Sequence, residues 1–203
     1  MAEFIEDSGG LESTTIGVFR SAATVKGGKR FSFGALVAVG DRRGRVSLGY
    51  AKANEVPPAI EKAQKEGKKT LARVTLNGGT IPHTVEGRYS SSIVRLIPAS
   101  PGTGVVAGAT VRAVLELVGV TDCLTKAYGS TNKKNLAKAT MAGLRLLQSK
   151  DAIATLRGIP IALSQVDEML EKGKAFMPAK KSGEGMKAPV NTVGGDKRGG
   201  GGR

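Results

Sequence analysis

The chain has 203 residues, 40% of them hydrophobic, which is enough to bury a core. Lys and Arg number 31 against 17 Asp and Glu, and this net charge of +14 predicts a polyanionic partner, with nucleic acid favoured over an anionic membrane surface. The sequence argues against a membrane-spanning protein, an intrachain disulfide and a thiolate zinc site, because no apolar run approaches roughly 18 residues and Cys123 is the single cysteine.

The first half of the chain predicts a small α+β domain. Residues 1–14 are polar and acidic, unlike a secretion signal, and we expect a flexible acidic arm there. Apolar runs then predict three antiparallel strands around IGVF (16–19), RFSFGALVAVG (30–40) and RVSLGYAKA (45–53). Residues 54–69 predict one covering helix, capped by Asn54 and with two prolines in its first turn. These elements place the first domain at residues 15–79.

A second domain is expected over residues 80–157. Two strands (80–89 and 92–100), a buried helix (108–119), a further strand (123–130) and an amphipathic helix (132–149) follow one another there. This order predicts a βαβα unit, and a parallel pair of strands would by default be joined by a right-handed crossover. The extension, residues 158–203, begins with two possible short helices, and its part from 174 onward predicts a largely disordered basic tail.

Positive residues gather at the loops of the first predicted sheet, opposed by Asp41 alone. They are Arg20, Lys26, Lys29, Arg30, Arg42, Arg43, Arg45 and Lys52. A charged edge that prevents aggregation is one interpretation, but one or two lysines suffice for that. The arginine fork suits phosphate oxygens, and Gly27 and Gly28 let a backbone approach a sugar-phosphate chain closely. This stretch therefore predicts an RNA-binding surface.

The aromatic side chains near this stretch have two possible roles. Phe31, Phe33 and Tyr50 could stack on bases, as in proteins that bind single strands. The chain has only 4% aromatic residues, however, so its core needs the few it has. We favour core packing for these rings.

A second candidate site is AYGSTNKKN, residues 127–135, at the start of the amphipathic helix. Ser130, Thr131 or Asn132 can cap that helix without any ligand. Lys133 and Lys134 oppose the helix dipole in the first turn, and they fit better if an anion binds beside them. We therefore include this segment, with the neighbouring Lys126, in the predicted RNA-binding set.

No catalytic site is evident. GTGVVAG, residues 102–108, has the spacing GxGxxxG instead of the dinucleotide fingerprint GxGxxG, and a tight packing loop is the better interpretation. His83 is the single histidine and has no partner for a metal site or a catalytic triad. A small-molecule phosphotransferase would need further acidic and phosphate-binding motifs. We expect no cofactor, no metal and no small-molecule substrate, and a cytoplasmic location.

Two long segments resemble a known family. TVKGGKRFSFGALVAVGDRRGRVSLGYAKANEVPPAIEKA (24–63) and PASPGTGVVAGATVRAVLELVGVTDCLTKAYGSTNKKNLAKAT (98–140) are similar to the two domains of the bacterial-type small ribosomal subunit protein five family. The resemblance implies a double-stranded-RNA-binding-like first domain and a second domain with a left-handed βαβ crossover. Ser47 and Ala51 depart from the pattern, because the family usually has glycine at both positions.

The resemblance also implies a function. A member of this family binds small-subunit ribosomal RNA and small-subunit proteins four and eight, lies along mRNA near its entry channel, and supports subunit assembly and decoding accuracy. By motif position, residues 26–29 become an RNA-contacting loop, and Gly102, Gly104 and Arg112 lie near the contact with protein four. A free-standing double-stranded-RNA-binding module is the alternative, and the phosphotransferase a remote one.

Overall fold

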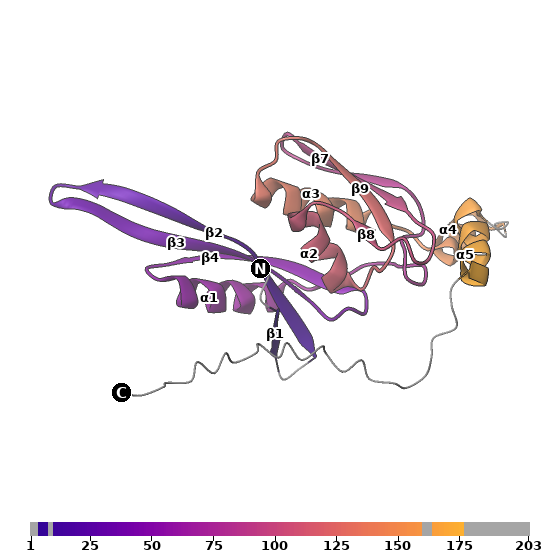
Figure 1. Ribbon diagram of the computed structural model, residues 1–203, viewed down its shortest axis with the longest axis horizontal. Coiled ribbons are helices and arrows are strands. Elements are labelled where there is room, and N and C mark those ends of the chain that lie inside the picture. The colour runs from indigo at the N-terminus through magenta and orange to yellow at the C-terminus, as the bar shows by residue number, and fades with distance from the viewer. Residues whose placement is uncertain (1–3, 8–9, 160–163, 177–203) are drawn as a thin grey trace, which may run out of the picture.

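The computed structural model of the chain describes residues 4–7, 10–159 and 164–176 (Figure 1), so most of the predicted tail lies outside the described residues. The first half forms one antiparallel sheet in the order β1-β2-β3-β4-β5 with helix α1 against it. Its elements are β1 (Phe4–Asp7), β2 (Leu11–Val25), β3 (Gly28–Gly40), β4 (Arg45–Ala53), α1 (Val56–Lys69) and β5 (Ala72–Arg73). The predicted strands and helix are all present.

The second half forms a mixed sheet in the order β6-β7-β9-β8. Its elements are β6 (Val85–Tyr89), β7 (Ser92–Pro98), β8 (Val105–Val106), α2 (Ala109–Val118), β9 (Cys123–Gly129) and α3 (Lys133–Arg145), followed by α4 (Lys150–Arg157) and α5 (Gln165–Phe176). The α+β class predicted from the sequence is confirmed. No described helix is long and apolar enough to cross a membrane.

The start of the chain differs from the predicted flexible arm. Strand β1 pairs antiparallel with β2, which begins at Leu11, and Ser13 and Thr14 are buried. The reason is that β2 pairs with β3 in the register Glu12↔Gly40, so the polar residues before Ile16 complete the sheet. The polarity of residues 1–14 therefore did not show where the first sheet begins.

One face of the first sheet packs against α1. Alternating residues of β3, Ala35, Val37 and Val39, meet Ala59 and Ala63 of the helix, as the two-residue period of a strand requires. The helix lies close because Gly49 of β4 leaves room, and a Cβ there would lie 1.9 Å from the carbonyl oxygen of Ala63. The N-cap of α1 is Glu55, one residue after the predicted Asn54, and it makes no side-chain cap.

The departure at Ser47 is accommodated by this packing. Its hydroxyl is buried and donates a 2.6 Å hydrogen bond to the carbonyl oxygen of Gly67, near the end of α1. Gly67 itself is needed for the approach, because a Cβ there would lie 2.8 Å from Cγ2 of Val39. Ala51 is also buried in this cluster. Small residues other than glycine therefore fit at both positions.

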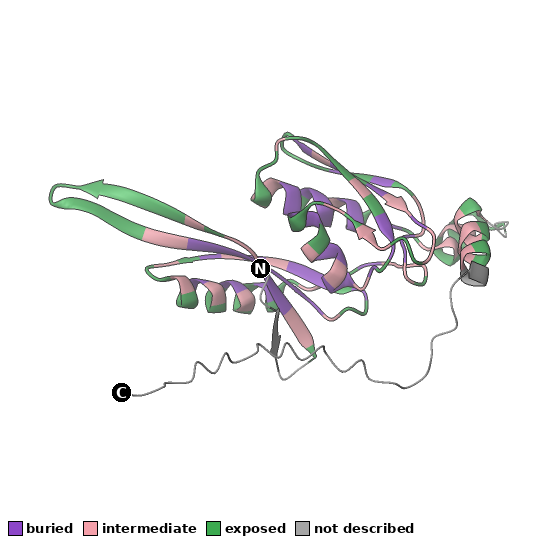
Figure 2. Cartoon of the chain, viewed as in Figure 1, coloured by how far each residue is buried: buried purple, intermediate pink, exposed green. Residues whose placement is uncertain are grey.

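The opposite face of the first sheet packs against the second half of the chain. Ala38 and Val46 share one core cluster with Val114 and Leu117 of α2 and with Val94 of the second sheet. The two halves are thus joined by a continuous core, and purple buried segments run across their junction in Figure 2. The first sheet lies between α1 and α2 at this end, and its other end is left free.

The strand that pairs parallel with β9 is β8, joined to it by α2, whereas β7, the strand that we expected before the helix, pairs antiparallel with β9. Strand β8 is the VV of the GTGVVAG motif, which we had expected to be only a loop. Helix α3 covers this sheet through a glycine contact, since a Cβ on Gly87 would lie 2.0 Å from the carbonyl oxygen of Ala139. The left-handed crossover implied by the family stays a prediction.

Candidate nucleic-acid interface

The longest projection of the molecule is the hairpin of β2 and β3. The two strands stay paired from Glu12↔Gly40 to Val25↔Gly28, and a two-residue turn closes them. Figure 1 shows this hairpin extending well beyond α1 and the second domain, and Figure 2 shows its outer half coloured as exposed. Residues 20–31 are all exposed. Packing of the core therefore does not explain why β2 and β3 extend so far.

The hairpin carries four of the predicted RNA-binding cations. Arg20 lies on β2, Lys26 lies in the turn, and Lys29 and Arg30 lie on β3. The last three form no ion pair with any described residue. Three neighbouring positive charges that no carboxylate neutralises repel one another until an anion binds. The hairpin end is therefore suited to a polyanion.

One aromatic prediction is wrong. Phe31 does not lie in the core: the residue is 44% exposed, and the guanidinium carbon of Arg20 lies 4.8 Å from the centre of its ring. The cation–π contact holds the arginine over the ring on the surface of the hairpin. Phe33 and Tyr50 are partly buried near the hairpin base. Phe31 and Arg20 thus place an aromatic ring and a guanidinium side by side on the exposed part of the hairpin.

The glycines of the turn leave the hairpin end unobstructed. Gly28 has a φ of +138°, which β-carbon-bearing residues rarely adopt, whereas Gly27 does not require such a value. No atom lies within 4 Å of a Cβ placed on either residue. Glycine at 28 is therefore set by the turn, and glycine at 27 leaves room for a close external contact.

The second cluster of arginines lies in the turn between β3 and β4. Asp41 organises this turn: its carboxylate accepts hydrogen bonds from the backbone N–H groups of Arg43 (2.8 Å) and Arg45 (2.9 Å) and from Nε of Arg45 (2.6 Å). Burial alone would raise the pKa of Asp41, but these hydrogen bonds and the nearby charge of Arg45 outweigh it and lower the pKa below 3.8. The side chain of Asp41 is thus paired with the guanidinium of Arg45.

The three arginines of this turn have different environments. Arg42 forms a 2.7 Å ion pair with Glu12, and its backbone N–H donates a 2.9 Å hydrogen bond to the carbonyl oxygen of Leu117 at the end of α2. Arg45 is paired with Asp41. Arg43 is exposed, and its guanidinium forms no ion pair among the described residues. Of the three, Arg43 has the guanidinium most available for a phosphate.

The second candidate site lies at the N-terminus of α3, where the sequence predicted a helix to start. The side chain of Asn132 caps the helix by accepting a 3.1 Å hydrogen bond from the backbone N–H of Lys134. Ser130 is tied to the β6–β7 turn, because its N–H donates to the carbonyl oxygen of Ser91 and its own carbonyl accepts from the hydroxyl of Ser92. Thr131 is exposed beside the cap.

The two lysines in the first turn of this helix, Lys133 and Lys134, have a structural explanation besides an anion. The ammonium of Lys134 lies 3.7 Å from the centre of the Tyr50 ring and 4.8 Å from that of Phe19. A Cβ on Gly17 of β2 would lie 3.3 Å from Cδ of Lys133, so this side chain lies along the hairpin base. The structure thus brings the helix start together with the hairpin base, and the charge of Lys134 is stabilised by ring faces.

The remaining predicted cations lie apart from the hairpin end. Lys52 is exposed on β4, opposite Gly34 where β3 enters the core. Lys126 is exposed on β9 of the second sheet, opposite Arg95 of β7. The structure therefore does not unite all predicted RNA-binding residues in one patch, and it places Arg95, which no loop pattern in the sequence indicated, opposite Lys126.

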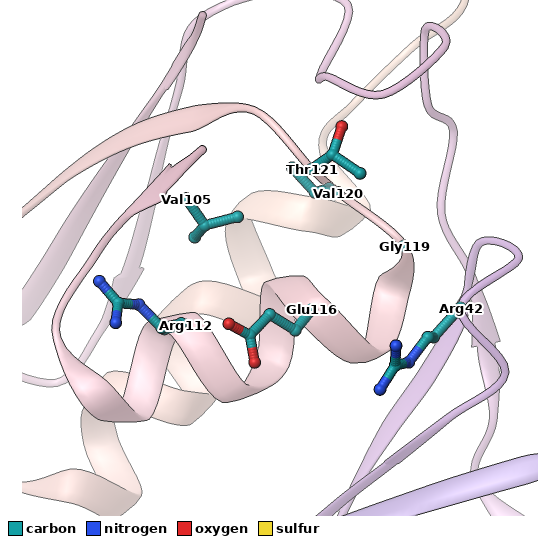
Figure 3. A pocket seen from close by; sticks show the side chains of 7 residues that line it. All are labelled: Arg42, Val105, Arg112, Glu116, Gly119, Val120 and Thr121. Atoms are coloured by element: carbon teal, nitrogen blue, oxygen red, sulfur yellow. The ribbon is translucent and has the colours of Figure 1, made fainter. Parts of the chain in front are cut away.

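The predicted protein contact lies beside an open cavity of about 590 Å³ (Figure 3). Arg112 and Glu116 project from α2 toward it, Val105 comes from β8, and Arg42 comes from the turn of the first sheet. Gly102 and Gly104 lie in the loop before β8 with φ values of +89° and +76°. The cavity thus joins elements of both domains.

The loop before β8 is held from within the protein. The backbone N–H of Gly104 donates a 2.9 Å hydrogen bond to Oδ1 of the buried Asp122, whose other oxygen accepts from the hydroxyl of Thr121. The carboxylate of Asp122 thus holds the loop before β8 in place. Within the described ranges, no group of three His, Cys, Asp or Glu residues could hold a metal ion.

Comparison with known proteins agrees with this architecture. The model of the ribosomal protein S5 N-terminal domain matches residues 11–75, and that of the S5 C-terminal domain matches residues 87–157. Together they cover more than half of the chain. The chain belongs to the ribosomal protein S5 family. This membership confirms the resemblance seen in residues 24–63 and 98–140, and it makes the chain a ribosomal protein.

Two curated relatives of the S5 family support the assignment over nearly their whole length. Small ribosomal subunit protein uS5 of Rhodopirellula baltica is 50% identical over 150 residues, which are 74% of this chain and 85% of the relative. Small ribosomal subunit protein uS5 of Psychromonas ingrahamii is 48% identical over 161 residues, which are 79% of this chain and 96% of the relative. The S5 match begins at residue 11, where β2 begins, and ends at residue 157, where α4 ends.

Proposed function

We propose that the chain is a structural, non-catalytic component of the small ribosomal subunit that binds small-subunit ribosomal RNA through the end of the β2–β3 hairpin. The observation that carries the proposal is the exposed group of Lys26, Lys29 and Arg30 on a projecting hairpin, without an ion pair to any described residue. The relatives are named as small ribosomal subunit proteins, and the small ribosomal subunit is an assembly that contains such an RNA.

The mechanism is charge neutralisation combined with shape. The cations contact phosphates, which sets the position and orientation of the hairpin without reading base sequence. Gly27 leaves room for a sugar-phosphate chain at the turn, and the paired strands keep the projection stiff. Release of counterions from the RNA makes such binding strongly dependent on salt.

The proposal extends to protein partners and to translation. Gly102, Gly104 and Arg112 form a contact with a neighbouring small-subunit protein, in the family protein four, beside the cavity of Figure 3. Protein eight is the second protein partner, and mRNA passes nearby at its entry channel. Through these contacts the chain supports subunit assembly and decoding accuracy in the cytoplasm.

Sedimentation of a cell lysate distinguishes this role from that of a free-standing double-stranded-RNA-binding module. We expect a tagged chain, expressed in a bacterium, to co-migrate with small ribosomal subunits in a sucrose gradient at moderate salt. A variant with Lys26, Lys29 and Arg30 changed to Gln should be incorporated less well than a control with Lys62, Lys65 and Lys69 of α1 changed to Gln. A tagged chain that stays at the top of the gradient contradicts the ribosomal role.

A further inference from the structure

A second cavity, of about 440 Å³, lies where the first sheet meets the start of α4. It is lined by Arg43, Gly44, Arg73, Val74, Thr75, Leu76 and Ser149. Two arginines and two hydroxyl-bearing residues in one cavity are unlike the mostly apolar and aromatic lining of a typical small-molecule site. The lining is instead that of an anion site.

Both arginines of this cavity lack a neutralising partner among the described residues. Arg43 and Arg73 are exposed, and neither forms an ion pair with a described residue. Arg73 of β5 is also directly opposite Arg45 of β4 in the sheet register. Like charges at directly opposed positions destabilise a strand pair, and Asp41 neutralises only Arg45. An anion between Arg43 and Arg73 would neutralise the charge of Arg73, which Asp41 does not reach.

Two backbone N–H groups beside the cavity already have partners within the protein. Gly44 N–H donates to the carbonyl oxygen of Val118 (2.8 Å), and Val74 N–H donates to that of Gly44 (2.7 Å). Ser149 is the N-cap of α4, where its oxygen accepts a 3.1 Å hydrogen bond from the N–H of Ala152. Its own O–H proton therefore remains available to an acceptor, at the positive end of the helix dipole.

Acidic groups near the start of α4 lie in a different cavity. Asp151 and Asp167 line the neighbouring one, together with Lys150, and Lys150 forms an ion pair with Asp167. The cavity of Arg43 and Arg73 has no acidic residue in its lining. The charged residues of its lining are therefore both positive, and it shares Thr75, Leu76 and Ser149 with the cavity that holds the acids.

We propose that this cavity binds a phosphate group, held by the guanidinium groups of Arg43 and Arg73 and by the hydroxyl of Ser149. If the proposed function holds, the bound phosphate group is a phosphodiester of the RNA backbone. The alternative ligand with the same chemistry is free phosphate or pyrophosphate. The site adds Arg73 and Ser149 to the residues that sequence patterns indicated, and it lies where the first sheet and the segment after it meet the start of α4.

The RNA arm of the test measures binding to small-subunit ribosomal RNA as a function of salt. For Arg43→Gln with Arg73→Gln, we expect the slope of log K against log[salt] to be less steep by about one unit, the loss of about one phosphate contact. The control, Arg145→Gln with Arg157→Gln, removes two exposed arginines elsewhere and should keep the original slope. A slope equal to that of the control overturns the RNA source.

The second arm is a titration of the full chain with inorganic phosphate and with pyrophosphate, followed by amide chemical shifts. Saturable shifts at Gly44, Thr75 and Ser149 that disappear in the double Arg→Gln variant identify free phosphate as a source. The absence of such shifts, together with an unchanged RNA slope, overturns the cavity proposal. If the native chain binds no RNA at all, the proposed function fails, and the phosphate titration still decides the cavity.

Discussion

The backbone N–H of Arg42 donates a 2.9 Å hydrogen bond to the carbonyl oxygen of Leu117, and this bond joins the turn after β3 to the last turn of α2. Gly44 makes the matching bond to Val118. The free carbonyl groups at a helix end are thus satisfied by a loop of the other domain. The arginine-bearing turn is therefore a joint between the domains as well as a basic surface.

Gly119 is expected to be essential for this joint. Its φ is +100°, and a Cβ there would lie 2.2 Å from the carbonyl oxygen of Arg42, so Gly119→Ala must strain the backbone and displace the turn. We expect a loss of about 1 to 3 kcal/mol or more in the free energy of unfolding, measured in urea. The control is Gly27→Ala, where the added carbon meets no atom within 4 Å. Equal stability of the two variants would contradict the joint.

The stabilising effect of Asp41 should depend on pH in a defined direction. Its pKa is lowered in the folded chain, so its contribution is present above the ordinary value of 3.8 and is lost as the pH falls through the folded value. At neutral pH, we expect Asp41→Asn to destabilise the protein by about 1 kcal/mol, and this difference should shrink below pH 3.8.

The measurement for Asp41 is urea unfolding of the native chain and the variant at several pH values. Glu61→Gln, on the exposed side of α1, serves as a control for the loss of one negative charge. A destabilisation by Asp41→Asn that is constant from neutral pH to pH 3 would mean that the carboxylate charge does not organise the turn.

The contact of Lys134 with the Tyr50 ring should appear as a coupling energy. The ammonium lies 3.7 Å from the ring centre, so a double-mutant cycle of Tyr50→Leu and Lys134→Met should give about 0.5 to 1 kcal/mol. Tyr50→Phe, which keeps the ring, should retain most of it. If the two changes are strictly additive in urea unfolding, α3 does not brace the hairpin base through this pair.

Cys123 should be protected from alkylation in the folded protein. Burial raises the pKa of its thiol from 9.0 to about 11, so very little thiolate forms at pH 8. We expect iodoacetamide to react much more slowly with the native chain than with the chain in urea. Because the unfolded thiol ionises first, its contribution to stability should also fall as the pH rises from 9 toward 11. Equal alkylation rates in both states would contradict the burial of this residue.

Local patterns predicted the elements but not their extent. The turn signals at residues 26–28 and 41–44 located both hairpins correctly, because glycine and charged residues mark turns directly. The projection of the β2–β3 hairpin was not predictable in this way. An exposed strand and a buried strand have the same backbone conformation. Only the tertiary packing shows that α1 covers one end of β3 and leaves the other end exposed.

The sequence predicted which charged residues form the candidate site, but it did not predict which side chains they contact. The sequence indicates Lys26, Lys29 and Arg30, but the ring contact of Lys134 depends on Tyr50, which lies far away in the chain. Phe31 was misassigned to the core because scarcity of aromatic residues is an argument about composition and carries no information on position. The opposition of Arg45 and Arg73 requires the register of β5, a strand of only two residues.

The salt dependence of RNA binding tests the central claim most directly. The variant with Lys26, Lys29 and Arg30 changed to Gln is compared with the Lys62, Lys65 and Lys69 control, each titrated against small-subunit ribosomal RNA. The hairpin account predicts that the slope of log K against log[salt] becomes less steep by about two to three units in the hairpin variant alone. Equal affinities and equal slopes for both variants would show that the end of the hairpin does not bind RNA.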